Sequence, residues 1–136
     1  MKIIFTLILL AAAPTAFAQT GTQPDIPPAF PGGMKAIHRI IEKNMQYPRQ
    51  ARIDRVGGKV VAKFVVDTLG NVTNIVIEEG IRDDIDNEAI RLVKLLNGWS
   101  PGIQKGKKKK VAFRLPLYFW PDNRFKREYE ELHGKS

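Results

Sequence analysis

Few residues in this sequence carry side chains that could do chemistry. The 136-residue chain has two histidines, His38 and His133, far apart in the sequence, and no cysteine. A metal site needs several converging ligands, so neither histidine is predicted to bind a metal or to act in catalysis. The absence of cysteine excludes a catalytic thiol and a disulfide. No cofactor is expected.

The acidic residues are also better explained by structure than by catalysis. The segment 82–88, RDDIDNE, lacks the glycine and the final glutamate spacing of a calcium-binding loop, whereas Asp84 or Asp86 suits the start of a helix. Glu78 and Glu79 are adjacent in a predicted strand, so they point to opposite faces of a sheet and cannot act on one substrate atom. The sequence contains no phosphate-binding loop or nucleophile elbow. It predicts a protein that is not an enzyme.

The strongest charge feature is a run of lysines at residues 107–110, in a chain whose formal net charge is +8. Such a run can be a solvated strand entrance that discourages edge-to-edge pairing. It can also attract an acidic segment or anionic lipid head groups, and the two roles are compatible. Because the start of the chain predicts export, no nucleic-acid partner is expected.

The first 18 residues have the pattern of a secretory signal peptide. Lys2 is followed by an apolar run over residues 3–13, and Ala16, Phe17 and Ala18 form a small-large-small cleavage pattern before Gln19. The run is shorter than the roughly 20 residues that a membrane span requires. We therefore expect export with cleavage, and an uncut membrane anchor over residues 3–18 is the alternative.

The remaining chain divides into a linker, one domain and a tail. Residues 19–33 contain four prolines and predict an extended linker, residues 34–119 carry periodic apolar patterns, and residues 120–136 form a charged tail, loose or with a short helix. An amphipathic helix begins at Met34 and must end by Gln46, since Pro48 disfavours helical geometry at Tyr47. Pro48 suits the first turn of a second, short helix that continues to about Asp54.

The second half of the domain predicts a small sheet covered by helices. Residues 58–68 and 72–79 alternate as two strands of a hairpin, residues 83–97 form a helix that Gly98 ends, and residues 109–119 form a last strand. Pro116 places that strand at a sheet edge. The predicted fold is α+β, a three-stranded antiparallel sheet with two main helices packed on one face.

Several of these segments, in this order, resemble the C-terminal domain of TonB, the energy-transducing protein of Gram-negative envelopes. The matching segments are QYP at residues 46–48, ARIDRVGGKVVAKFVVDTLGNVTNIVI at 51–77, DNEAIRLV before WSPG, and VAFRLPLYF at 111–119. The resemblance covers about residues 30–119. It implies the fold predicted above and a location in the periplasm.

The resemblance also implies a partner and a binding site. In this family the domain binds the short N-terminal box of TonB-dependent outer-membrane receptors, which adds as an extra strand beside the last strand. The implied role is envelope transport of the siderophore or nutrient type. Residues 46–48 can equally serve only to set the angle between two helices. The implied contact residues are Gln46, Tyr47, Pro48, Val111, Ala112, Phe113, Arg114, Leu115, Leu117, Tyr118 and Phe119.

The sequence departs from the family's transducers at its N-terminal end. Those proteins have a membrane helix with a histidine that couples to a motor complex, and a long proline-rich spacer. Here the apolar segment has no histidine, and a linker of about 15 residues spans only about 45 Å. We therefore expect a free-standing periplasmic protein that binds a receptor without pulling on it, with the inner-membrane motor complex as a partner only if the N-terminus stays uncut.

Two other interactions are open at this stage. A general cell-envelope interaction domain, binding peptidoglycan or anionic lipid through its basic surface, is the alternative function. The exposed edge of the last strand also allows two copies to pair as a homodimer.

Overall fold

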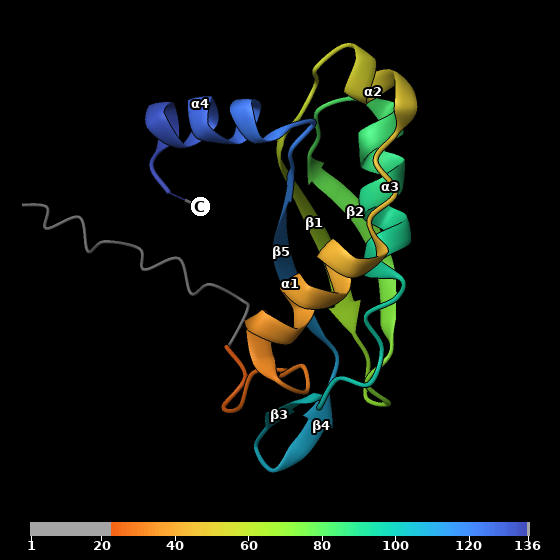
Figure 1. Ribbon diagram of the computed structural model, residues 1–136. Helices are drawn as coiled ribbons and strands as arrows, with labels where there is room; N and C mark the ends of the chain where they lie inside the picture. Colours follow the sequence, from red (N-terminus) through yellow and green to blue (C-terminus); the bar gives the residue numbers. More distant parts are fainter. Residues whose placement is uncertain (1–22, 136) are drawn as a thin grey trace, which may run out of the picture.

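The computed structural model describes residues 23–135, so the predicted signal peptide lies outside the described residues (Figure 1). Among the described residues, no helix is long and apolar enough to cross a membrane. The elements follow in the order α1 (Gly33–Asn44), α2 (Arg49–Ile53), β1 (Gly58–Val66), β2 (Val72–Glu79), α3 (Asp83–Val93), β3 (Gly102–Gln104), β4 (Lys107–Lys109), β5 (Val111–Phe119) and α4 (Asn123–His133).

The main sheet has three antiparallel strands in the order β2-β1-β5. Strand β1 is central, and β5 pairs with it without interruption from Gly58 opposite Phe119 to Val66 opposite Val111. The other edge of β5 has no neighbouring strand among the described residues. Pro116 therefore lies in an edge strand, as its missing N–H predicted.

The core lies between this sheet and helices α1 and α3. Every second residue of β1, from Val60 to Val66, is buried, and Leu115, Leu117 and Phe119 of β5 are buried on the same face. Burial of these apolar side chains is the main force that holds the helices on the sheet. The α+β fold predicted from the sequence is confirmed.

Two segments at one end of the domain have secondary structure that was not predicted from the sequence. Residues 107–109, expected at the entrance to the last strand, form β4 and pair with β3 as a separate hairpin. Ile26 and Ala29, expected in the linker, make paired backbone bonds to Ile103 and Ser100. The chain therefore enters the domain along β3, and we call residues 25–30 the strap.

The tail contains a regular helix, α4, which extends from the end of the sheet beyond β5 (Figure 1). Its N-cap is Asp122, whose side chain accepts a hydrogen bond from the backbone N–H of Phe125 at 2.7 Å. None of its residues is buried. Its position depends on a few contacts at its base, described below.

Trp99 joins the separate parts of the domain. Its ring contacts Phe30 of the strap, Phe64 of β1 and Phe113 of β5 at centroid distances of 5.3, 5.7 and 5.0 Å. Its indole N–H donates to the carbonyl oxygen of Leu96 at 2.7 Å, and only 4% of the residue is exposed. Trp99 is therefore part of the core and joins the strap to β1 and β5.

Gly70, in the turn between β1 and β2, gives a test of the packing around Trp99. Its φ is 81°, and a Cβ there would overlap the carbonyl oxygen of Trp99. Gly98 has a similar φ of 90° with open space around it. We expect Gly98→Ala to lower the free energy of unfolding by about 1 kcal/mol, through backbone strain alone. Gly70→Ala should cost at least about 2 kcal/mol more, because the clash adds to the strain.

Urea unfolding of both variants measures this difference. Equal losses of stability in the two variants would contradict the close contact between the turn and Trp99.

Candidate partner-binding site

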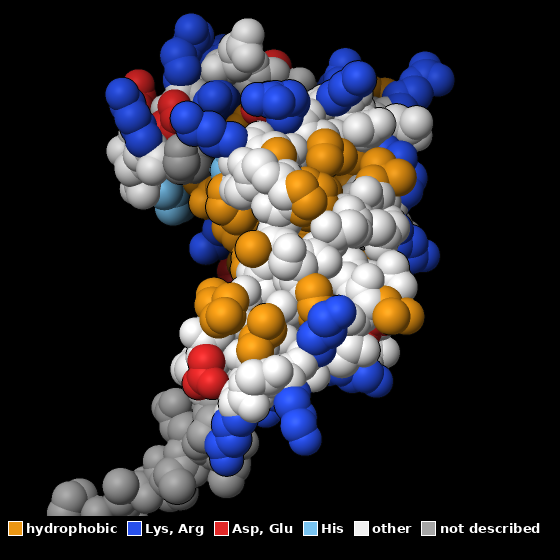
Figure 2. Space-filling view, turned by 90° about the horizontal axis from the view of Figure 1, so that it is seen from below, with side chains coloured by type: hydrophobic (Ala, Val, Ile, Leu, Met, Phe, Trp, Pro, Cys, Tyr) orange, Lys and Arg blue, Asp and Glu red, His pale blue; other side chains and the backbone are white. Residues whose placement is uncertain are grey.

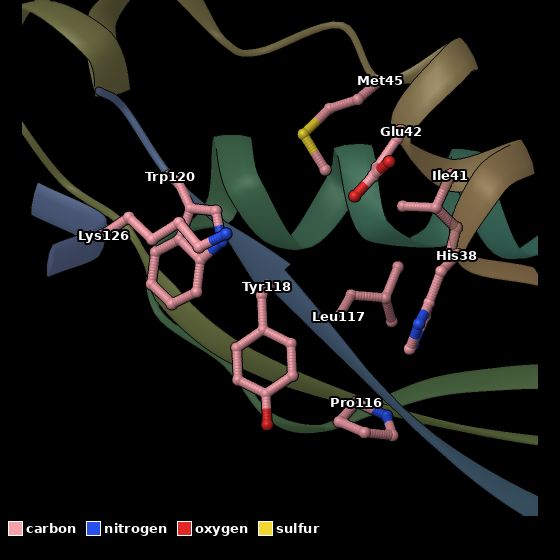
Figure 3. A pocket seen from close by; sticks show the side chains of 9 residues that line it. All are labelled: His38, Ile41, Glu42, Met45, Pro116, Leu117, Tyr118, Trp120 and Lys126. Carbon is pink, nitrogen blue, oxygen red and sulfur yellow. The ribbon is translucent and has the colours of Figure 1, made fainter. Parts of the chain in front are cut away.

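A groove of about 330 Å³ lies beside β5, between α1 and α4 (Figure 3). Helix α1 supplies one wall, Trp120 and Lys126 supply the other, and β5 supplies the floor. The lining residues are His38, Ile41, Glu42, Met45, Pro116, Leu117, Tyr118, Trp120 and Lys126. The groove therefore follows the strand whose outer edge is unpaired.

The groove is lined mostly by apolar and aromatic side chains, with a charged residue on each wall. Trp120 stacks on Tyr118, with ring centroids 5.5 Å apart and an interplanar angle of 22°. Glu42 of α1 and Lys126 of α4 lie on opposite walls. Such a lining can bury apolar side chains while opposite charges act on polar groups of the same ligand.

The α4 wall is fixed at its base by Asp122. In addition to capping the helix, Asp122 accepts a hydrogen bond from Nε of Arg55 at 3.0 Å. The Phe125 N–H, and then Arg55, hold the pKa of the Asp122 carboxyl below its usual value. Tyr129 packs on Trp120 at 5.0 Å, which joins the middle of α4 to the groove.

The α1 wall is fixed at its C-terminal end by a buried carboxylate on α3. Glu88 is 8% exposed and accepts a hydrogen bond from the backbone N–H of Gln46 at 3.0 Å. Arg91 pairs with Glu88 and also donates to the carbonyl oxygen of Asn44 at 2.6 Å. This network holds the end of α1 on α3 and satisfies a charge whose burial would otherwise be costly.

Tyr47 joins the connection between α1 and α2 to the end of β5. Its ring packs edge-on against Phe119 at 6.2 Å, and its hydroxyl donates to the carbonyl oxygen of Val56. Arg52 lies over the ring at 5.4 Å. Burial raises the pKa of Tyr47 to about 12.

The structure places residues 46–48 close to β5 but not in the groove. Tyr47 reaches Phe119, Gln46 is held by Glu88, and Pro48 is the N-cap of α2. Met45, one residue earlier, is the member of this segment that lines the groove. In this structure residues 46–48 therefore fix how α1 and α2 lie against α3 and β5.

The predicted contact residues of β5 differ in what they can offer a partner. Leu115, Leu117 and Phe119 are buried in the core, so a partner at the strand edge can reach only their backbone. The exception is Leu117, which also lines the floor of the groove. Ala112 and Arg114 are exposed, and Val111, Phe113 and Tyr118 are partly buried. Arg114 pairs with Glu78 across the outer face of the sheet at 2.7 Å.

Sequence reasoning missed the two walls of the groove. Residues on α1 were recognised as helical but not as neighbours of the last strand, which no local pattern indicates. Trp120 and Lys126 were assigned to a tail, although Phe125, Tyr129 and Leu132 repeat at helical spacing and could have indicated α4. Within residues 23–135, no group of three His, Cys, Asp or Glu side chains could hold a metal ion.

Tyr47→Phe tests the contact between this tyrosine and the core. The variant should be about 1 kcal/mol less stable than the wild type at neutral pH, because a hydrogen bond to Val56 is lost. The native pKa of about 12 exceeds the ordinary 10.0, so the unfolded chain loses this proton first. Stability from Tyr47 is therefore complete below pH 10 and is lost as the pH rises to 12.

Urea unfolding at several pH values should show the wild type losing stability relative to the variant over that window. A stability difference that stays constant up to pH 12 would contradict the burial of the Tyr47 hydroxyl.

Comparisons with known proteins identify the domain. The profile of a family described as "Gram-negative bacterial TonB protein C-terminal" matches residues 43–121. No curated protein sequence matches the chain.

Two solution structures of the Helicobacter pylori TonB C-terminal domain match this chain. The longer fragment is 21% identical, with 62% of this chain and 76% of that chain covered and a TM-score of 0.48. The shorter is 21% identical, with 66% of this chain and 94% of that chain covered and a TM-score of 0.50. Because the family profile spans more than half of the sequence, the chain belongs to the TonB C-terminal domain family.

Proposed function

We propose that this protein binds TonB-dependent outer-membrane receptors in the periplasm, by adding an extended receptor segment to the free edge of β5. The observation that carries the proposal is the unpaired outer edge of β5 beside a groove walled by α1 and α4. An unpaired strand edge offers main-chain donors and acceptors to another strand. A groove along that edge offers places for the added strand's side chains.

Family membership supports the same partner class. The TonB C-terminal domain is a non-enzymatic energy-transducing and protein-interaction domain of the envelope, which confirms that the chain is not an enzyme. The family interacts in general with outer-membrane receptors. Transport of siderophores or similar nutrients is the role that we propose for such binding here.

Main-chain pairing would carry the affinity, since the inward side chains of β5 are already used in the core. We expect the nitrogen of Pro116 to face the free edge, where its missing N–H costs no bond to β1. Ala112 is an even number of residues away, so its N–H should face the same edge. The docking edge then has a donor at Ala112 and none at Pro116.

A titration of the isotope-labelled chain with N-terminal peptides of the host's TonB-dependent receptors tests the proposal. Saturable amide shifts are expected over Val111–Phe119 and at His38 and Lys126 in the groove walls. A peptide of the same composition in scrambled order is the control. Shifts confined to other surfaces, or none at millimolar peptide, would refute strand addition at β5.

Two substitutions in β5 should change peptide affinity in opposite directions. Ala112→Pro removes a donor from the free edge and should weaken binding by up to about ten-fold, the value of one hydrogen bond. Pro116→Ala restores a donor and should strengthen binding by a similar factor. Ala112→Val keeps the N–H and is the matched control.

Isothermal titration with the same peptides measures the three affinities, and thermal unfolding confirms that each variant is folded. If Ala112→Pro binds like Ala112→Val while both are folded, the partner does not pair with this edge.

A further inference from the structure

The end of the molecule opposite α4 carries a concentrated positive charge. Of the six residues 105–110, in the β3–β4 hairpin and just after it, five are lysines, and all five are exposed. They are Lys105, Lys107, Lys108, Lys109 and Lys110. Within residues 23–135 none of them forms an ion pair, and the sequence has no acidic residue between Glu88 and Asp122.

The hairpin holds these lysines on a fixed backbone. Strands β3 and β4 pair from Gly102 opposite Lys109 to Gln104 opposite Lys107. The strap pairs with β3 on its other side, and Asp25 accepts a hydrogen bond from the backbone N–H of Lys105 at 2.8 Å. Lys105 adopts a φ of 51°, a value that is uncommon for a lysine. The lysines are therefore carried by a hairpin whose backbone is fixed by pairing within the hairpin and with the strap.

Exposed apolar side chains lie at the same end. Ile26 pairs with Ile103 of the hairpin and is 54% exposed. Leu69, in the turn between β1 and β2, is 82% exposed, and its neighbour Gly70 accepts a hydrogen bond from the N–H of Trp99. Figure 2 looks onto this end and shows hydrophobic side chains exposed across it, with Lys and Arg side chains around them.

The N-terminal start of the described chain lies at the same end of the molecule as the lysines. Asp25 and Ile26 contact the hairpin, so the described part of the chain begins beside the lysines, and the apolar run at residues 3–13 precedes it in the sequence. From residue 18 to residue 25 the chain can span at most about 25 Å. An apolar segment held in a bilayer would keep the hairpin within that distance of its surface.

We infer that the β3–β4 hairpin, with Ile26 and Leu69, docks on an anionic phospholipid surface. Anionic head groups complement the lysines, and the interfacial region accepts exposed apolar side chains. This surface lies at the opposite end from α4, so the protein can hold a bilayer and a receptor segment at once (Figure 1). The inference goes beyond receptor binding and does not depend on it.

Partitioning of the full chain onto vesicles tests the inference. Phosphatidylcholine vesicles are compared with vesicles that also contain phosphatidylglycerol, at low and at physiological salt. Each lysine near an anionic surface strengthens binding by about five-fold. The wild type should therefore prefer the anionic vesicles by well over ten-fold at low salt and lose most of this preference as salt is raised.

The informative variant replaces Lys107, Lys108, Lys109 and Lys110 by Gln. It should lose about ten-fold or more of the preference for anionic vesicles and bind neutral vesicles like the wild type. The matched control removes four charges elsewhere, with Lys43, Arg49, Arg127 and Lys135 replaced by Gln, and should keep most of the preference. Leu69→Ser should weaken binding to anionic vesicles by several-fold.

Circular dichroism and peptide binding at β5 show whether each variant is folded. Equal losses in the two four-site variants would overturn the inference, because net charge alone would then explain binding. Lysine-dependent binding to peptidoglycan sacculi, with no preference for anionic vesicles, would also overturn the inference. The ligand of the hairpin would then be peptidoglycan. Failure of receptor peptides to bind leaves this result unaffected.

Discussion

The packing around Trp99 is the interaction on which the arrangement of this domain depends. One side chain contacts the strap through Phe30, the central strand through Phe64 and the edge strand through Phe113. Its indole N–H donates a hydrogen bond to the carbonyl oxygen of Leu96, just after α3, and its backbone N–H donates to the carbonyl oxygen of Gly70 in the β1–β2 turn. Parts of the chain that are far apart in sequence are thus fixed by one buried ring, and both the hairpin and the edge strand take their positions from it.

The groove beside β5 depends on two additions to the sheet rather than on the sheet itself. His38, Ile41 and Glu42 precede the family match at residues 43–121, and Lys126 follows it. The floor of the groove comes from the shared domain, and much of both walls comes from flanking segments. If a partner binds in this groove as proposed, its selectivity can differ between relatives that share the same edge strand, because exposed wall side chains such as Glu42 and Lys126 can change without disturbing the core.

Much of the fold could be predicted from the sequence because its signals are local. The alternation along β1, the turn ended by Gly70, the helix stop at Gly98 and the effect of Pro48 each follow from a few neighbouring residues. The resemblance in the order of motifs is the source of the proposal that the edge strand is a docking site. What could not be predicted are contacts between distant segments: the strap on β3, the hairpin made by the lysine run, and the approach of α1 and α4 to β5. These depend on tertiary packing, for which residues such as Ile26 or Lys126 carry no local pattern.

The strap determines how this domain would respond to tension on its N-terminus. Ile26 and Ala29 make four backbone hydrogen bonds, two to Ile103 of β3 and two to Ser100 before it, and Asp25 accepts one more from Lys105. A pull on the N-terminus would reach the bond of Asp25 first, then those of Ile26 and then those of Ala29, which is their order along the chain. Release of residues 25–29 would free about 17 Å of chain before the load reached Phe30 and the ring of Trp99. The strap would then act as a short extensible segment, which detaches first and leaves the three-stranded sheet intact.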